Sequence, residues 1–299
     1  MIEPFRDFGG RGPLIHIAHA NGYPPGAYRA FAAALAPLGR VIGQTTRMLQ
    51  PGTDPKNLAS WHELAHDLVR LLEAEATAGG STIGIGHSLG GVLTLYAAVE
   101  RPALFRAVVL IEPVFLVPEL IALARAAGSA FDPFALVATA LRRRDRFGSR
   151  AEALAHWRPK PVFAGVGDDV LADYVDAALR EDPDAKSPDE RFRLAYPRAW
   201  EARIHSTPPL DVWDLVPRLA VPTLAIRGQT TDTITAAAWA HWQRLQPAAR
   251  FVEVPDSGHL APFERPEAVA ATIAAFLADL GPVDVAAGRL VAGPRGAAT

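Results

Sequence analysis

The stretch T-I-G-I-G-H-S-L-G-G-V-L-T-L, residues 82–95, places one serine, Ser88, between two apolar runs. The first run is typical of a buried strand and the second of a helix, so Ser88 is predicted to stand on a strand-to-helix turn. Residues Gly86 to Gly90 fit the pattern G-x-S-x-G, in which the turn is so tight that neighbouring residues must lack side chains. Such a turn holds the hydroxyl above the carboxyl edge of a sheet, where open α/β sheets bind ligands. Ser88 is therefore the candidate nucleophile.

Short apolar segments alternate with helix-like segments on both sides of this turn. Strands that are apolar throughout and separated by helices indicate a parallel sheet that is covered on both faces. We therefore predict an α/β fold with a mostly parallel central sheet and helices on both of its faces. The other expected strands are residues 14–18, 40–44, 107–111, 221–227 and 250–254.

The alternation breaks between residues 116 and 216, where helix-like segments follow one another with almost no strand signal. We predict that residues 116–216 form a helical cap, inserted before the penultimate strand. The sheet domain then consists of residues 1–115 and 217–281. Residues 282–299 are rich in Gly, Ala and Arg without periodicity, and we expect a flexible tail there.

The composition excludes several function classes. The 299 residues include 30 basic and 32 acidic side chains, so neither nucleic acid nor an anionic membrane surface is an expected partner. There is no cysteine, which excludes disulfides, a thiolate metal site and a cysteine nucleophile, and we expect no metal or other cofactor. The first residues do not resemble a signal peptide, and no uncharged apolar stretch could span a bilayer. We therefore expect a cytoplasmic protein without membrane insertion.

A serine hydroxyl needs a base to take its proton and an acid to orient that base. His259, in V-P-D-S-G-H-L-A-P, follows the last expected strand and is the candidate base. Asp232 follows the strand 221–227 and gives the chain order Ser, Asp, His, which is one of the known triad orders. Glu112, at the end of the strand after the serine helix, is the alternative acid. We expect Asp232 to fill this position.

The loop after the first expected strand has the composition of an oxyanion hole. It reads H-A-N-G-Y-P-P-G-A-Y, residues 19–28, and its glycines and prolines suit a tight loop with unpaired backbone N–H groups. One of these groups, together with the N–H of Leu89, is suited to hold a tetrahedral oxyanion. We interpret His19 as a structural residue that braces the loop.

These features resemble the α/β-hydrolase fold family, and specifically its capped members, over about residues 10–280. The resemblance rests on the elbow G-H-S-L-G-G, the loop after the first strand, the acid after the penultimate strand, and G-H-L-A-P-F-E-R-P-E around the histidine. It implies Ser88 as nucleophile, His259 as base and Asp232 as acid, with residues 116–216 as a lid over the pocket.

The resemblance also implies which backbone groups hold the oxyanion. In the family's register, Asn21 supplies the second N–H beside that of Leu89. The family's loop commonly reads His-Gly, whereas this chain has Ala20 after the histidine, so Ala20 and Gly22 remain alternative donors.

The activity that the resemblance implies is that of a serine hydrolase. It would cleave a carboxylic ester or a related acyl substrate, such as a lactone or thioester, through a Ser-His-Asp triad and an acyl-enzyme intermediate. A serine at the elbow argues against haloalkane dehalogenases and epoxide hydrolases, which use aspartate there. A carbon–carbon bond hydrolase of β-diketone-like substrates and a non-catalytic small-molecule receptor on the same scaffold remain alternatives.

The inserted segment is expected to supply the walls of a pocket for a small molecule with an apolar acyl or alcohol part. Core packing within the cap is the alternative role for each aromatic residue. The basic stretch 140–160 indicates either helix faces that attract the acidic stretch 168–190 or, at residues 142–146, a rim for an anionic substrate. No feature of the sequence sets an oligomeric state. The aromatic candidates are Phe131, Phe134, Trp157, Tyr174 and Trp200.

Overall fold

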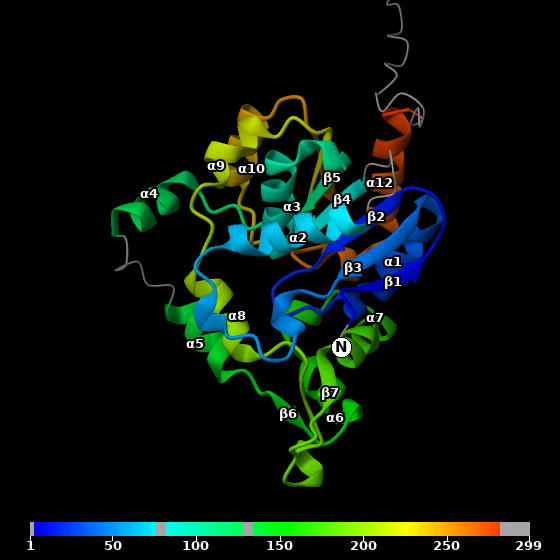
Figure 1. The fold of residues 1–299 in the computed structure, drawn as a ribbon, viewed down its shortest axis with the longest axis vertical. Helices are drawn as coiled ribbons and strands as arrows, with labels where there is room; N and C mark the ends of the chain where they lie inside the picture. Colours follow the sequence, from blue (N-terminus) through cyan, green and yellow to red (C-terminus); the bar gives the residue numbers. More distant parts are fainter. Residues whose placement is uncertain (1–2, 76–81, 128–133, 282–299) are drawn as a thin grey trace, which may run out of the picture.

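A seven-stranded sheet forms the centre of the computed structural model, which describes residues 3–75, 82–127 and 134–281 (Figure 1). The strand order is β1-β3-β2-β4-β5-β9-β10, and every neighbouring pair is parallel except β1 and β3. The predicted mostly parallel sheet is confirmed, and β1 is a strand that the sequence analysis did not expect. The strands are β1 (Phe5–Gly9), β2 (Leu14–Ala18), β3 (Arg40–Gln44), β4 (Thr82–His87), β5 (Phe105–Ile111), β9 (Thr223–Gly228) and β10 (Arg250–Val254).

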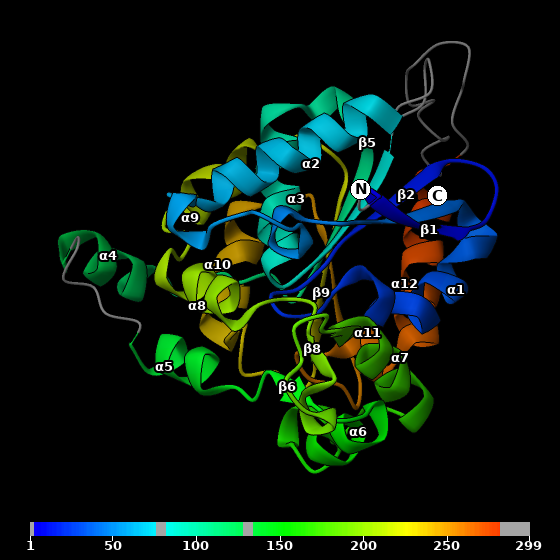
Figure 2. The ribbon, with the colours of Figure 1, turned by 60° about the horizontal axis from the view of Figure 1, so that its bottom comes forward.

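Helices cover both faces of this sheet, as predicted (Figure 2). Helices α1 (Arg29–Leu35) and α12 (Pro266–Asp279) pack on one face, and their apolar side chains join Ile15, Ile83 and Val109 in one buried cluster. The opposite face packs against a second cluster, built on strand residues such as Val108 and Ala225. Alternate strand residues are thus buried on opposite faces, which is why these strands are apolar throughout. The helices on the second face are α2 (Trp61–Glu75), α3 (Leu89–Glu100) and α10 (Ala236–Leu245).

The predicted insertion leaves the sheet after β5 and returns to it at β9. Besides helices it contains three short antiparallel strands in the order β6-β8-β7, which the sequence analysis missed. Figure 1 shows most of this part below the sheet, with α4 and α5 at one side of the molecule and α9 beside α10. We refer to residues 116–216 as the cap. Its helices are α4 (Pro118–Ala127), α5 (Phe134–Arg142), α6 (Arg150–Trp157), α7 (Asp168–Ala178), α8 (Arg198–Ser206) and α9 (Val212–Leu215), and its strands are β6 (Arg146–Phe147), β7 (Leu179–Glu181) and β8 (Phe192–Leu194).

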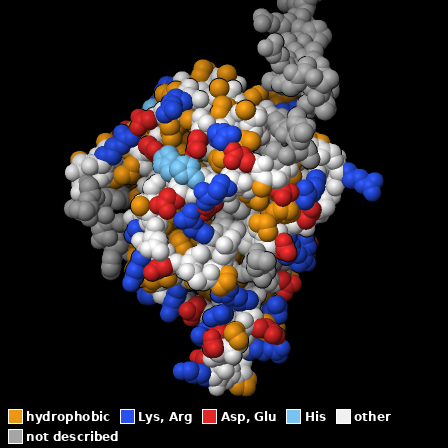
Figure 3. Space-filling model, in the orientation of Figure 1, with side chains coloured by type: hydrophobic (Ala, Val, Ile, Leu, Met, Phe, Trp, Pro, Cys, Tyr) orange, Lys and Arg blue, Asp and Glu red, His pale blue; other side chains and the backbone are white. Residues whose placement is uncertain are grey.

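Many of the cap's charges pair with one another, and Figure 3 shows basic and acidic side chains mixed over one face of it. The side chain of Asp182 is fully buried and is contacted by Arg146 and Arg193 from the two neighbouring strands. Arg150 and Asp176 likewise join α6 to α7, with 3.0 Å between nitrogen and oxygen. These pairs agree with the interpretation in which the basic and acidic stretches attract each other.

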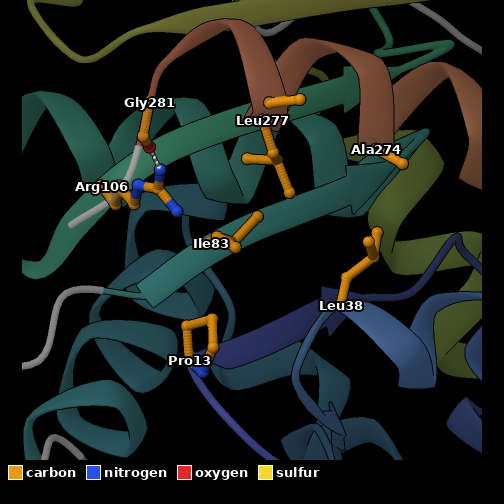
Figure 4. A pocket seen from close by; sticks show the side chains of 8 residues that line it. Pro13, Leu38, Ile83, Arg106, Ala274, Leu277 and Gly281 are labelled. Atoms are coloured by element: carbon orange, nitrogen blue, oxygen red, sulfur yellow. Dashed lines mark hydrogen bonds between the residues drawn. The ribbon is translucent and has the colours of Figure 1, made fainter.

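A cavity of about 370 Å³ lies at the amino ends of the strands, away from the edge where β4 ends at the serine (Figure 4). Its walls are mostly apolar, and Arg106 donates a hydrogen bond to the carbonyl of Gly281 there. None of its described lining residues is a serine, histidine or carboxylate, so it offers no nucleophile or base.

Residues 282–299, the expected tail, lie outside the described residues. Over the described residues, every helix is too short or too polar to cross a membrane. The same residues hold no group of three or more side chains suited to bind a metal ion.

Candidate active site

Ser88 stands on a strained turn between β4 and α3. Its φ of 56° lies in the left-handed region, which residues other than glycine rarely adopt. A Cβ on Gly86 would lie 2.2 Å from the carbonyl oxygen of Gly90, and one on Gly90 would lie 2.0 Å from the carbonyl oxygen of Ala18. Both glycines are therefore required by backbone contacts. The N–H of Ser88 donates to the carbonyl of Ile111 at 3.0 Å, which ties the turn to β5.

His259 brings its imidazole to the serine from the loop after β10. Its Nε2 is 3.1 Å from the Oγ of Ser88, within hydrogen-bond distance. The loop is held from two sides, because Gly258 donates its N–H to the carboxylate of Glu264 and the ring of His87 contacts the carbonyl of His259 at 2.8 Å. A quarter of the His259 side chain is exposed, so the pair is accessible from outside the core.

Glu112 lies on the other side of the imidazole. Its Oε2 is 3.3 Å from Nδ1 of His259, and its side chain is fully buried. The carboxylate also accepts hydrogen bonds from the N–H of Gly228, at 2.7 Å, and from the hydroxyl of Thr231. Glu112 follows β5 directly and has a φ of 49°, the second strained residue of the site. Ser88, His259 and Glu112 thus form one hydrogen-bonded line.

The structure corrects the expectation that Asp232 orients the histidine. Asp232 is exposed, and within the described residues it makes no hydrogen bond or ion pair with His259. The reason is that β5 and β9 are neighbours whose carboxyl ends reach the same edge. The loop after β9 uses Gly228 and Thr231 to hold Glu112, and Asp232 is left at the surface of that loop. Glu112, the alternative acid of the sequence analysis, is therefore the carboxylate that contacts His259.

Three backbone N–H groups remain suited to an oxyanion, one at the start of α3 and two in the loop after β2. Leu89 is the first residue of α3, and the first N–H groups of a helix have no acceptor within it. In the loop after β2, the N–H of Ala20 donates to the hydroxyl of Tyr28 at 2.9 Å, which removes Ala20 from the alternatives. Asn21 and Gly22 remain. The cap fixes Asn21, because Tyr196 donates to its Oδ1 at 2.9 Å and its Nδ2 donates to the carbonyl of Glu201 at 3.2 Å.

His87 and Tyr28 link this loop to the histidine loop, and the sequence analysis did not single out either. Tyr28 accepts from the N–H of Ala20, so its own hydroxyl proton points to Nδ1 of His87, 2.7 Å away. The opposite ring nitrogen then carries the proton that is donated to the carbonyl of His259. Burial lowers the pKa of His87 to about 3, so the ring is neutral at pH 7, as this chain of bonds requires. The sequence signal for His87 was its place directly before Ser88 in G-H-S-L-G.

His19 braces the loop after β2, as the sequence predicted. Its Nδ1 is 2.8 Å from the carbonyl oxygen of Ala20, and its Nε2 is 3.0 Å from the hydroxyl of Thr46. Burial lowers the pKa of His19 to about 4, so it acts as a neutral hydrogen-bonding group. Both ring nitrogens are engaged, and neither contacts Ser88.

The aromatic pocket candidates have different positions. Trp157 and Tyr174 line a cavity of about 480 Å³ in the cap, together with Tyr23 of the loop after β2. Trp200 is buried in the second core cluster and serves packing. Phe134 is the first residue of α5. Phe131 lies outside the described residues.

Comparison with known proteins places the chain in a group of hydrolases. A family model described as "Alpha/beta hydrolase family" matches residues 14–272. No curated protein matches the sequence. Among solved structures, that of E-2-(acetamidomethylene)succinate hydrolase has 21% sequence identity and a TM-score of 0.77, over 92% of this chain and 94% of that one.

Two further structures show the same likeness. A peroxisomal alpha-beta-hydrolase from Saccharomyces cerevisiae has 18% identity and a TM-score of 0.76, over 95% of this chain and 81% of that one. An enol-lactonase from Burkholderia xenovorans LB400 has 20% identity and a TM-score of 0.61, over 92% of this chain and 95% of that one. At these identities the likeness concerns the fold.

Proposed function

The chain belongs to the alpha/beta hydrolase family, and from this premise we propose that it is a serine hydrolase of carboxylic esters or related acyl substrates, such as lactones or thioesters. The observation that carries the proposal is the hydrogen-bonded line of Ser88, His259 and Glu112. Its distances are 3.1 Å from serine to histidine and 3.3 Å from histidine to glutamate. A nucleophile, a base and an orienting acid in this order are the machinery of acyl transfer.

In the first half-reaction, the Oγ of Ser88 attacks the substrate's carbonyl carbon while Nε2 of His259 accepts the hydroxyl proton. The buried carboxylate of Glu112 holds the ring so that Nδ1 keeps its proton, and it stabilises the imidazolium that forms. The tetrahedral oxyanion accepts hydrogen bonds from the N–H groups of Leu89 and Asn21. His259 then gives its proton to the leaving group as the carbon–oxygen or carbon–sulfur bond breaks, which leaves the acyl group on Ser88.

The second half-reaction repeats these steps with water. His259 takes a proton from a water molecule, and the resulting oxygen nucleophile attacks the acyl carbon. Collapse of the second tetrahedral intermediate breaks the bond to Oγ, and His259 returns the proton to Ser88. The products are the acid and the alcohol or thiol, and the side chains end as they began.

The experiment that tests this proposal is hydrolysis of p-nitrophenyl esters, from acetate to long acyl chains, by the wild type and by Ser88→Ala. We expect turnover in the wild type and a loss of at least about 10³-fold in the variant, because the nucleophile is removed. Labelling by a fluorophosphonate should occur only when Ser88 is present. Full activity of Ser88→Ala would overturn the assignment. Absence of both turnover and labelling in the wild type would favour a receptor.

A further inference from the structure

The cavity of about 480 Å³ in the cap combines aromatic walls with a basic rim. Trp157, Phe163 and Tyr174 form the walls and are almost completely buried, with ring centroids 5.0 to 5.1 Å apart from one to the next. A cavity of this size holds a drug-sized molecule, and aromatic walls favour a planar, apolar body.

The rim carries an excess of positive charge. Its lining includes four cations, Arg142, Arg143, Arg144 and Lys160, and one carboxylate, Glu201. The inner charge is already paired, because Arg143 contacts Glu201 at 2.7 Å. Arg144 pairs with a glutamate of α6 on the outside of the cap.

The other two rim cations, Arg142 and Lys160, are exposed and can contact a bound anion. Within the described residues no carboxylate lies within 4 Å of the Arg142 guanidinium or the Lys160 ammonium. Burial lowers the pKa of the neighbouring His156, and the positive charges of Lys160 and Arg144 lower it further. The ring therefore adds no positive charge at pH 7, and the direction of its pKa agrees with a positive potential at the rim.

The inner end of the cavity adjoins the loop that holds the proposed oxyanion donor. A Cβ on Gly22 would lie 3.1 Å from Nη1 of Arg143 and 3.4 Å from Oε2 of Glu201, so this ion pair packs against the residue next to Asn21. Tyr23, the following residue, is itself a wall of the cavity. Its ring lies 5.4 Å from that of Phe263, in the short helix after His259. The loop after β2 therefore borders this cavity, and Tyr23 connects it to the helix that follows His259.

We propose that this cavity binds the non-reacting part of the substrate, a carboxylate carried on a planar, apolar body such as an aromatic ring. The inference rests on the proposed hydrolase function and names its substrate class. The ring lies in the cavity against the wall that Trp157, Phe163 and Tyr174 form together, and the carboxylate accepts hydrogen bonds from Arg142 and Lys160 at the mouth. Charge-assisted bonds of this kind are stronger than neutral ones, and they select an acid over its amide.

A binding measurement tests the site without catalysis. Ser88→Ala protein is titrated calorimetrically with 2-naphthoate and with 2-naphthamide, which differ only in charge and hydrogen-bonding pattern. We expect naphthoate to bind about tenfold more tightly at low salt, with a smaller ratio at 0.5 M NaCl, because screening weakens contacts at an exposed rim. Adding Arg142→Gln and Lys160→Gln to this protein should reduce the ratio to near one.

Matched controls remove the same charges elsewhere. Arg11, on the turn between β1 and β2, and Lys186, between β7 and β8, are both exposed and lie outside the cavity lining. Arg11→Gln and Lys186→Gln should keep the preference for naphthoate. Equal binding of the acid and the amide, or an equal effect of the control substitutions, would overturn the proposal.

A kinetic measurement separates this inference from the proposed function. We expect kcat/KM to be about tenfold higher for 6-acetoxy-2-naphthoate than for 6-acetoxy-2-naphthamide, mainly through KM. If both esters are hydrolysed equally and Ser88 is required, the hydrolase assignment stands and the carboxylate site is refuted. If neither is hydrolysed but Ser88→Ala protein prefers naphthoate, the site stands and the hydrolase assignment fails.

Discussion

Glu112 and His259 are 147 residues apart in the chain, and their side chains meet with 3.3 Å between Oε2 and Nδ1. The contact exists because Glu112 directly follows β5, the strand next to the serine strand, while His259 lies in the loop after the last strand. The contact identifies Glu112, after β5, rather than Asp232, after the neighbouring strand β9, as the carboxylate at the histidine.

The first prediction follows from this contact. Glu112→Gln should lower kcat by about 10⁴-fold with little change in KM, because the wrong histidine tautomer is then held. Asp232→Asn, at an exposed carboxylate, should change kcat by less than about threefold. The measurement is steady-state hydrolysis of a p-nitrophenyl ester, with thermal unfolding to show that both variants are folded. A larger loss for Asp232→Asn would return the acid to the loop after β9.

The second prediction concerns the glycines of the turn. Gly90→Ala should destabilise the protein by several kcal/mol or prevent folding, because its Cβ would lie 2.0 Å from a backbone oxygen. Gly52→Ala is the control for backbone strain without a clash. Gly52, unlike Gly90, has a positive φ, of 77°, and a Cβ there meets nothing within 4 Å. It should cost only about 1–2 kcal/mol, the strain of the conformation alone. Urea unfolding of the two variants gives the comparison, and equal losses would contradict the contact.

The third prediction tests the bridge between the two catalytic loops. Tyr28→Phe leaves the N–H of Ala20 and the Nδ1 of His87 without their partner, and both are buried. We expect a loss of about 1–3 kcal/mol in the free energy of unfolding, together with a lower kcat. The effect on kcat distinguishes the bridge from simple core packing, because His87 also positions the backbone of His259. Unchanged kcat and stability would show that the bridge is dispensable.

The fourth prediction is a loss of stability in acid. Burial lowers the pKa of His16 and His87 to about 3 and that of His19 to about 4 in the folded chain, below the unfolded value of 6.5. Each group therefore contributes its full stability above pH 6.5, and loses it as the pH falls from there toward 3–4. The slope is small above pH 6.5 and approaches about 1.4 kcal/mol per pH unit for each histidine below it. Urea unfolding between about pH 7.5 and 5 measures it.

His16 gives this prediction a specific variant. Both of its ring nitrogens are buried without a partner among the described residues. His16→Leu should remove about a third of the acid slope and raise stability at pH 5. His66→Gln, at a side chain that is half exposed, should leave the slope unchanged. An unaltered slope in His16→Leu would show that this ring is not the titrating group.

The turn and the sheet were predictable from the sequence for a physical reason. Apolar runs of strand length are buried, and a central parallel sheet covered by helices buries them on both faces. The glycines around Ser88 indicate a turn in which the backbone leaves no room for side chains. His259 was predictable because parallel strands bring all their carboxyl ends to one edge. The structure places it at hydrogen-bond distance from Ser88.

Other features depend on contacts that a single sequence does not display. Glu112 and Asp232 follow adjacent strands, and the choice between them depends on the φ of 49° at Glu112 and on the donors from Gly228 and Thr231. The cap strands are only two or three residues long, which is too short for an alternating pattern. Trp157 and Trp200 are both buried aromatics, and only their neighbours show that one lines a cavity and the other a core.

The hydrogen bonds from the cap to Asn21 have a consequence for how such a chain can diversify. Exchanging the whole insertion for that of a relative would remove Tyr196 and Glu201, and with them two partners of the Asn21 side chain. The insertion is therefore not an independent cassette. Substitutions inside the insertion change its pocket and leave these hydrogen bonds in place. A transferred insertion would need its own hydrogen-bond partners for Asn21 in the loop after β2.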